Sequence, residues 1–144
     1  MEFINQVIHA LTETHPLHPM LVHFPIALTG AGALFILLAA WKNSSALEQA
    51  AFANITLAFF GSIAAGLSGM RDNISTYDGL APNAGTKVIL AFVLILITGG
   101  TAYARWRNPK LFTTSKGIYI AAYVVSFLIA LVLAFLGGVI LYGF

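Results

Sequence analysis

The fold of this chain is decided by the stretch THPLHPMLVHFPIALTGAGALFILLAAW, residues Thr14–Trp41. Its second part, from Ile26 to Trp41, is an apolar run without a charged residue. With the residues just before it, this run is long enough to cross the hydrocarbon core of a bilayer, which takes about 20 residues of helix. Its first part places three of the four histidines, His15, His18 and His23, among three of the five prolines. An ionisable residue at the lip of a membrane span is expensive to keep, so these histidines are the first candidates for a functional site.

The composition of the whole chain is that of a membrane protein. Of its 144 residues, 59% are hydrophobic and 8% are charged, whereas a soluble domain carries about 25% charged residues. Four runs are long enough to span a bilayer, near residues 20–41, 50–69, 87–104 and 118–142. They are continuous rather than alternating in polarity, which excludes the strands of a membrane barrel. We therefore expect an all-α fold in which residues 1–144 form a single domain, a bundle of four transmembrane helices.

The N-terminal residues predict a short amphipathic helix that lies in the membrane interface before the first span. Apolar residues recur at helical spacing among polar ones, namely Phe3, Ile4, Val7, Ile8 and Leu11. A helix packed on a partner subunit fits this pattern equally well. No Lys or Arg precedes the first span, so the charged region of a signal peptide is missing and we expect the first helix to stay in the mature protein.

Several classes of function are excluded or disfavoured by the residues that the chain lacks. It has no cysteine, which excludes disulfides, thiolate metal ligands, iron–sulfur clusters and thioether-attached haem. The net charge is only +2 and the basic residues form no nucleic-acid motif, so we expect no nucleic-acid partner. Neither an inverted repeat nor a catalytic triad or carboxylate pair is visible, which disfavours a transporter and a hydrolase. An electron-transfer or accessory subunit is a better expectation than a stand-alone enzyme.

The basic residues of the loops predict the orientation of the bundle. Five of them lie in the first and third loops, namely Lys42, Arg105, Arg107, Lys110 and Lys116, and two at the margins of the second, namely Arg71 and Lys87. Short cytoplasmic loops carry the excess of Lys and Arg. We therefore expect a multi-pass protein of the bacterial inner membrane, with both termini, the histidines and the Met70–Thr86 loop on the outer face.

The spacing of His18 and His23 predicts the relative depth and direction of their side chains on a helix. Pro19 is suited to the first helical position, which would make His18 the N-cap of the first span. His23 would then lie about 7 Å deeper and be turned roughly 140° from His18. The pair would not line one face, as a metal pair four residues apart does. Ala27 and Gly30, one and two turns after His23, would leave a shallow groove beneath its imidazole.

Pro25 and a set of small residues predict how the helices are shaped and packed. Pro25 frees the carbonyl of Leu21 and is expected to kink the helix beside the histidines. The small residues are Gly61, Ser62, Ala65, Gly66 and Gly69 on the second span, Gly99 and Gly100 on the third, and Gly137 and Gly138 on the fourth. Such residues let helix backbones approach closely, so we expect a tightly packed bundle.

Haem b is the cofactor that these residues suit best. A neutral imidazole is a common axial ligand of haem iron, and His23 or His18 is the candidate. Met70, at the end of the second span, is the intrachain candidate for the second axial ligand. Arg71 beside it is suited to pairing with haem propionates. Gly137-Gly138 and Tyr142 are candidates to close the same pocket.

Three functions therefore remain open. The first is a haem b-binding electron-transfer subunit with its site near the outer face, completed by Met70 or by a residue of a partner chain. The second is a structural or accessory subunit of a larger respiratory or photosynthetic membrane complex. The third is a metal site at the outer lip, formed by His15, His18 and His23 with Asp72 or Asp78. Each implies contact with lipid and with other membrane subunits or further copies of the chain, and the first also implies a redox partner at the outer face.

The stretch His18-Pro19-Met20-Leu21-Val22-His23-Phe24-Pro25-Ile26-Ala27-Leu28 resembles the motif of a bacterial family of small four-helix membrane proteins known only as a domain of unknown function. The motif of that family is His-Pro, three residues, then His-Phe-Pro and an apolar helix. Gly137-Gly138 and Tyr142 are similar to the end of its closing helix. Members commonly carry further histidines near the start of the third helix and after the last tyrosine. Here those regions read Pro82-Asn83-Ala84-Gly85-Thr86-Lys87 and Gly143-Phe144, so both histidines are missing.

Overall fold

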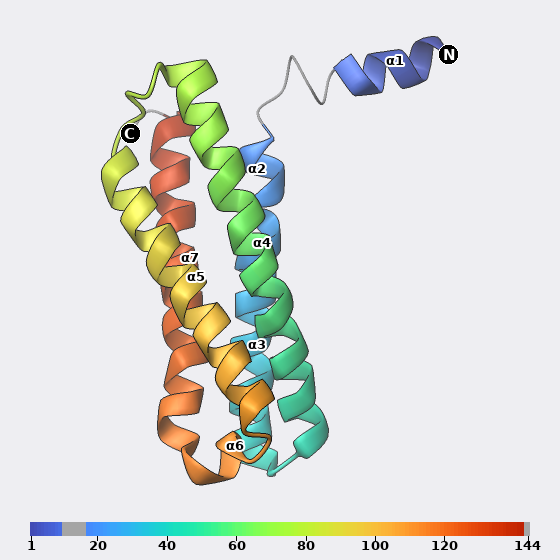
Figure 1. Ribbon diagram of the computed structural model, residues 1–144, viewed down its shortest axis with the longest axis vertical. Coiled ribbons are helices and arrows are strands. Elements are labelled where there is room, and N and C mark those ends of the chain that lie inside the picture. The colour runs from blue at the N-terminus through green and yellow to red at the C-terminus, as the bar shows by residue number, and fades with distance from the viewer. Residues whose placement is uncertain (10–16, 143–144) are drawn as a thin grey trace.

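The structure is a computed structural model that describes residues 1–9 and 17–142, with side chains as far as Val139, and these residues form helices joined by short connections (Figure 1). The four long helices are α3 (His23–Lys42), α4 (Ser45–Tyr77), α5 (Ala84–Arg107) and α7 (Lys116–Tyr142). The three short ones are α1 (Glu2–His9), α2 (His18–Leu21) and α6 (Leu111–Thr114). Four candidate spans, the first of which joins α2 to α3, are long and apolar enough to cross a membrane. The expected all-α fold with four spanning helices and an N-terminal helix is confirmed.

The long helices form a bundle in which each helix runs antiparallel to the next (Figure 1). α3 packs against α4 and α7, and α5 packs against the same two helices. One end of the bundle holds α2, the end of α4 and the start of α5, and we call it the α2 end; the opposite end holds α6, and we call it the α6 end. α1 is drawn to the side of the bundle, level with the α2 end, at the top of Figure 1.

The second long helix extends well past the span predicted for it. The sequence placed this span near residues 50–69 and a loop at Met70–Thr86, but α4 continues to Tyr77 and the connection to α5 covers only residues 78–83. Within this extension Asp72 continues the buried face of α4 and accepts a hydrogen bond from the backbone N–H of His18. The helix ends where Asp78 and Gly79 take positive φ angles of 49° and 79°, which breaks the helical backbone.

The first span is interrupted at Val22, between α2 and α3. Pro25 has no N–H to donate to the carbonyl of Leu21, so the helix lacks one backbone hydrogen bond at this point. The next bond, from the N–H of Ile26 to the carbonyl of Val22, is long at 3.4 Å. Leu17 rather than His18 is the N-cap residue of α2. His18 therefore does not cap its own helix, and its side chain is available for contacts with α4.

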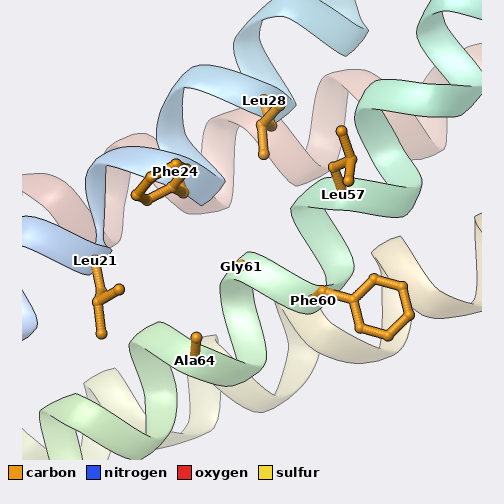
Figure 2. Close-up of a pocket in the computed structure, with 7 residues that line it drawn as sticks. All are labelled: Leu21, Phe24, Leu28, Leu57, Phe60, Gly61 and Ala64. Carbon is orange, nitrogen blue, oxygen red and sulfur yellow. The ribbon is translucent and has the colours of Figure 1, made fainter.

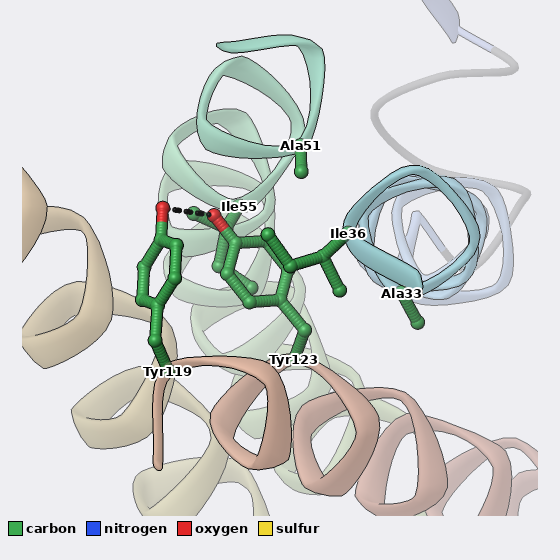
Figure 3. Close-up of a cluster of buried hydrophobic side chains, with 6 residues drawn as sticks. All are labelled: Ala33, Ile36, Ala51, Ile55, Tyr119 and Tyr123. Atoms are coloured by element: carbon green, nitrogen blue, oxygen red, sulfur yellow. Dashed lines mark hydrogen bonds between the residues drawn. The ribbon is translucent and has the colours of Figure 1, made fainter. Parts of the chain in front are cut away.

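The core lies where α3, α4 and α7 meet. Its buried cluster consists of Ala33, Ile36, Ala51, Ile55, Tyr119 and Tyr123 (Figure 3). The alanines let α3 and α4 approach closely, and the two tyrosine rings of α7 fill the space beside them. The tyrosine rings lie edge to face with centroids 5.1 Å apart, an arrangement that favours aromatic packing.

The close packing expected from the small residues is found at some of them only. A side chain at Gly66 would meet no atom closer than 4.0 Å, whereas a Cβ at Gly99 would lie 2.7 Å from the ring of Phe59. The tight contact between α4 and α5 is therefore formed at Gly99.

Gly99→Ala should destabilise the bundle by about 1–3 kcal/mol, because the new methyl group must displace the Phe59 ring in a packed interface. Gly100→Ala is the matched control, since nothing lies within 4 Å of a Cβ at the neighbouring position. The measurement is the free energy of unfolding of both variants in detergent. Equal stabilities would show that α4 and α5 do not meet at Gly99.

Candidate functional site

The candidate site is built around His18, whose side chain points from α2 onto α4. Its Nδ1 atom lies 2.9 Å from the carbonyl oxygen of Ala65 and 3.2 Å from Oγ of Ser68. Its backbone N–H donates to Oδ2 of Asp72 at 3.0 Å. These contacts hold both the backbone and the ring of His18 against two turns of α4.

The contact with Ala65 decides which ring nitrogen of a neutral His18 carries the proton. A carbonyl oxygen only accepts, so Nδ1 is the donor and Nε2 keeps its lone pair. Ser68 also donates its hydroxyl to the carbonyl of Ala65, at 2.9 Å, so the imidazole and this hydroxyl share one acceptor. Histidines that ligate metals almost always donate their other ring N–H to a carbonyl or carboxylate in this way. A neutral His18 therefore keeps its free lone pair on Nε2.

Gly69 gives the imidazole its place on α4. A Cβ at this position would lie 2.8 Å from Cε1 of His18 and 3.0 Å from Nδ1. Only a glycine leaves room for the ring this close to the backbone of α4. One turn further, Asp72 is 9% exposed, and its bond to the N–H of His18 offsets part of the cost of burying a carboxylate.

The other three residues expected at the cofactor lie on the surface of the bundle. Met70 is 58% exposed, and Arg71 and His23 are exposed as well. Met70 follows Gly69 directly, so it is turned about 100° around α4 from the face that holds His18. His23 follows the break at Val22 and points away from the interior. The structure brings His18 together with Asp72 and does not bring it together with His23, Met70 or Arg71.

The shallow groove expected beneath His23 is filled at Gly30. A Cβ at Gly30 would lie 3.0 Å from the ring of Phe127, a side chain of α7, whereas Ala27 is exposed. Gly137 and Gly138 have no neighbouring side chain within 4 Å of a Cβ position. The side chain of Tyr142 lies outside the described part of the chain.

The predicted metal site does not form among the described residues. Within residues 1–9 and 17–142, no group of three or more His, Asp or Glu side chains is placed to hold a metal ion. His15, one of its proposed ligands, lies outside these ranges. Asp78 lies in the exposed connection after α4.

A second polar cluster lies at the α6 end, and the sequence analysis missed it. Glu48 on α4 is 4% exposed and accepts from both Nε and Nη2 of Arg105 on α5, at 2.6 and 2.9 Å. The hydroxyl of Tyr119 on α7 donates to Oε1 of Glu48 at 2.8 Å and lies 2.9 Å from the hydroxyl of Tyr123. The Arg105 guanidinium also lies over the ring of Phe52, 5.2 Å from its centroid. The cluster ties three helices together, and both carboxylate oxygens of Glu48 accept hydrogen bonds.

One signal in the sequence points to this second cluster. Glu48 is the only acidic residue on the side of the membrane where the five basic loop residues gather. A lone carboxylate among cations is a candidate for an ion pair. Which cation it meets depends on how α4 and α5 are rotated, and the sequence does not give that rotation.

The comparisons with known proteins give a family and no closer relative. A family model described as "Predicted membrane protein (DUF2231)" matches residues 14–144. The matched range contains all four long helices and His18, and it begins after α1. No curated protein and no solved structure matches the chain.

Proposed function

Because this chain belongs to the DUF2231 family of predicted membrane proteins, whose function is unknown, its function must be argued from its site, and we propose that it binds haem b through His18 and transfers electrons within a membrane complex. The observation that carries this proposal is the bond from Nδ1 of His18 to the carbonyl of Ala65. It supports the proposal because a neutral ring that donates from Nδ1 keeps the lone pair on Nε2 that an axial ligand needs.

The contacts of His18 leave one ring nitrogen for a ligand. Gly69 gives the ring room against α4, and Nδ1 lies within hydrogen-bond distance of the Ala65 carbonyl and the Ser68 hydroxyl, so a neutral ring keeps its lone pair on Nε2. The sequence ranked His23 first, but His23 is exposed on the bundle surface, which moves the ligand role to His18. When bound, haem iron supplies one-electron chemistry. The chain itself holds the imidazole through Ala65 and Ser68, and it holds the backbone of His18 through Asp72.

The second axial ligand comes from another subunit in this proposal. Met70, the intrachain candidate, lies on a different face of α4 from His18. A ligand from a neighbouring chain would make the haem a part of the contact between subunits.

A cofactor-free accessory subunit is the second candidate. One observation favours it: a Cβ at Gly100, Gly137 or Gly138 would meet nothing within 4 Å. These positions leave open faces on α5 and α7, where a helix of a larger complex can approach closely.

We further propose that the protein lies in the bacterial inner membrane with the α2 end outside. The support is the excess of Lys and Arg in the two loops of the α6 end. A tag inserted after Arg107 should resist a protease added outside intact cells and be cut after lysis. Cleavage of this tag in intact cells would reverse the orientation and place the site of His18 on the cytoplasmic face.

The absorption spectrum of the purified, dithionite-reduced protein tests the haem proposal. We expect the α and β bands of haem b, and we expect them to be unchanged in His9→Ala because residue 9 lies on α1, outside the bundle. A protein that unfolds cooperatively and shows no such bands would contradict the haem proposal and leave the accessory subunit as the better account.

A further inference from the structure

An apolar groove of about 450 Å³ runs along the outside of the bundle between the first and second spans (Figure 2). Its two walls come from α2 and α3 on one side and from α4 on the other. The lining residues are Leu21, Phe24 and Leu28 on the first side and Leu57, Phe60, Gly61 and Ala64 on the second. All seven side chains are hydrocarbon or absent, so the groove offers no hydrogen bond to an occupant.

Gly61 and Ala64 form the floor of the groove. A Cβ at Gly61 would lie 3.4 Å from Cβ of Phe24 and from Cδ of Pro25, so α3 and α4 approach closely here. Larger side chains stand up on either side of this contact, since Phe24, Leu57 and Phe60 are about 60% exposed. A channel between raised walls suits a narrow, flexible chain better than a flat ring.

Arg71 lies in line with the groove on α4. Leu57, Ala64 and Arg71 are spaced by seven residues, or two helical turns, so they lie on nearly the same face of the helix. Arg71 is about 10 Å beyond Ala64 toward the α2 end, and Leu57 is about 10 Å on the other side. The exposed guanidinium therefore stands at the membrane-surface end of a groove that leads toward the middle of the span.

We propose that this groove binds one acyl chain of an anionic phospholipid whose phosphate pairs with Arg71. The groove supplies apolar contact, and its volume lies within the range of about 300–1,000 Å³ that is usual for ligand sites. A guanidinium binds a phosphate through two parallel hydrogen bonds. The long arginine stem can lie along the apolar surface while its head reaches the lipid headgroups. This site is separate from His18 and does not depend on haem.

Native mass spectrometry of the purified protein, titrated with phosphatidylglycerol or phosphatidylcholine of the same acyl chains, tests the proposal. The wild-type protein should bind phosphatidylglycerol more tightly than phosphatidylcholine. Arg71→Gln should weaken the binding of phosphatidylglycerol about fivefold and remove most of this preference. Arg107→Gln, an exposed arginine at the α6 end, is the matched control and should keep the preference.

A second variant tests the groove itself. Ala64→Leu places a larger side chain on its floor and should weaken the binding of both lipids, while the thermal unfolding midpoint stays near that of the wild type. Equal binding of the two lipids by the wild type, or an unchanged preference in Arg71→Gln, would overturn the proposal. A dimer in detergent that Ala64→Leu dissociates would overturn it too, because a second copy would then occupy the groove.

Discussion

Replacing Arg105 with methionine is expected to destabilise the bundle by about 3–5 kcal/mol, because it leaves the buried carboxylate of Glu48 without its cation. Glu48 would keep only the hydroxyl of Tyr119 as a donor. The measurement is the free energy of unfolding in mixed detergent micelles. Arg107→Met is the matched control, since Arg107 is an exposed cation at the end of the same helix, and its stability should stay within about 0.5 kcal/mol of the wild type.

The double variant Glu48→Met/Arg105→Met separates the value of the ion pair from the cost of an unpaired charge. Replacing both partners of a buried pair by apolar residues is often neutral. We therefore expect the double variant to recover most of the stability that Arg105→Met loses. If Arg105→Met were as stable as the wild type, the ion pair would contribute nothing to the packing of α4 against α5.

His18→Ala is expected to abolish haem binding in the reduced, purified protein. The variant removes Nε2, the only ring nitrogen that keeps a lone pair when Nδ1 donates to Ala65. His23→Ala is the matched control within the same span and should retain the bands, because its side chain lies on the surface. Imidazole added to His18→Ala should restore part of the haem spectrum by entering the space that the side chain leaves.

The opposite pattern would contradict this assignment. If His23→Ala lost the bands while His18→Ala kept them, the ligand would lie on the outer surface of α3. In that case the bonds of His18 to Ala65 and Ser68 would have a structural role only.

The helices of this protein could be predicted because hydrophobicity alone determines where a membrane chain spans. The end of α4 is an exception. Residues 70–77 were predicted as a loop, but they continue α4, and Asp72 among them accepts a hydrogen bond from the backbone of His18, 54 positions earlier. A contact between residues so far apart cannot be read from the local sequence.

The histidine motif led to the candidate site, but the rotation of the helices decided which histidine faces the interior. His18 and His23 lie on different faces of the span, as their five-residue spacing predicts, and it is His18 that contacts α4 while His23 is exposed. The sequence did not predict the Glu48 cluster, because the hydrogen bonds of that cluster join residues 57 and 71 positions apart. Sequence spacing says which residues share a face of one helix and says nothing about which faces meet.

The most direct test of the central claim is the haem content per chain, measured in parallel for the wild type and His18→Ala after identical purification. The account predicts haem b in a stoichiometric amount in the wild type and its loss in a folded His18→Ala protein. A wild-type protein without haem, or a His18→Ala protein with the full haem content, would contradict it.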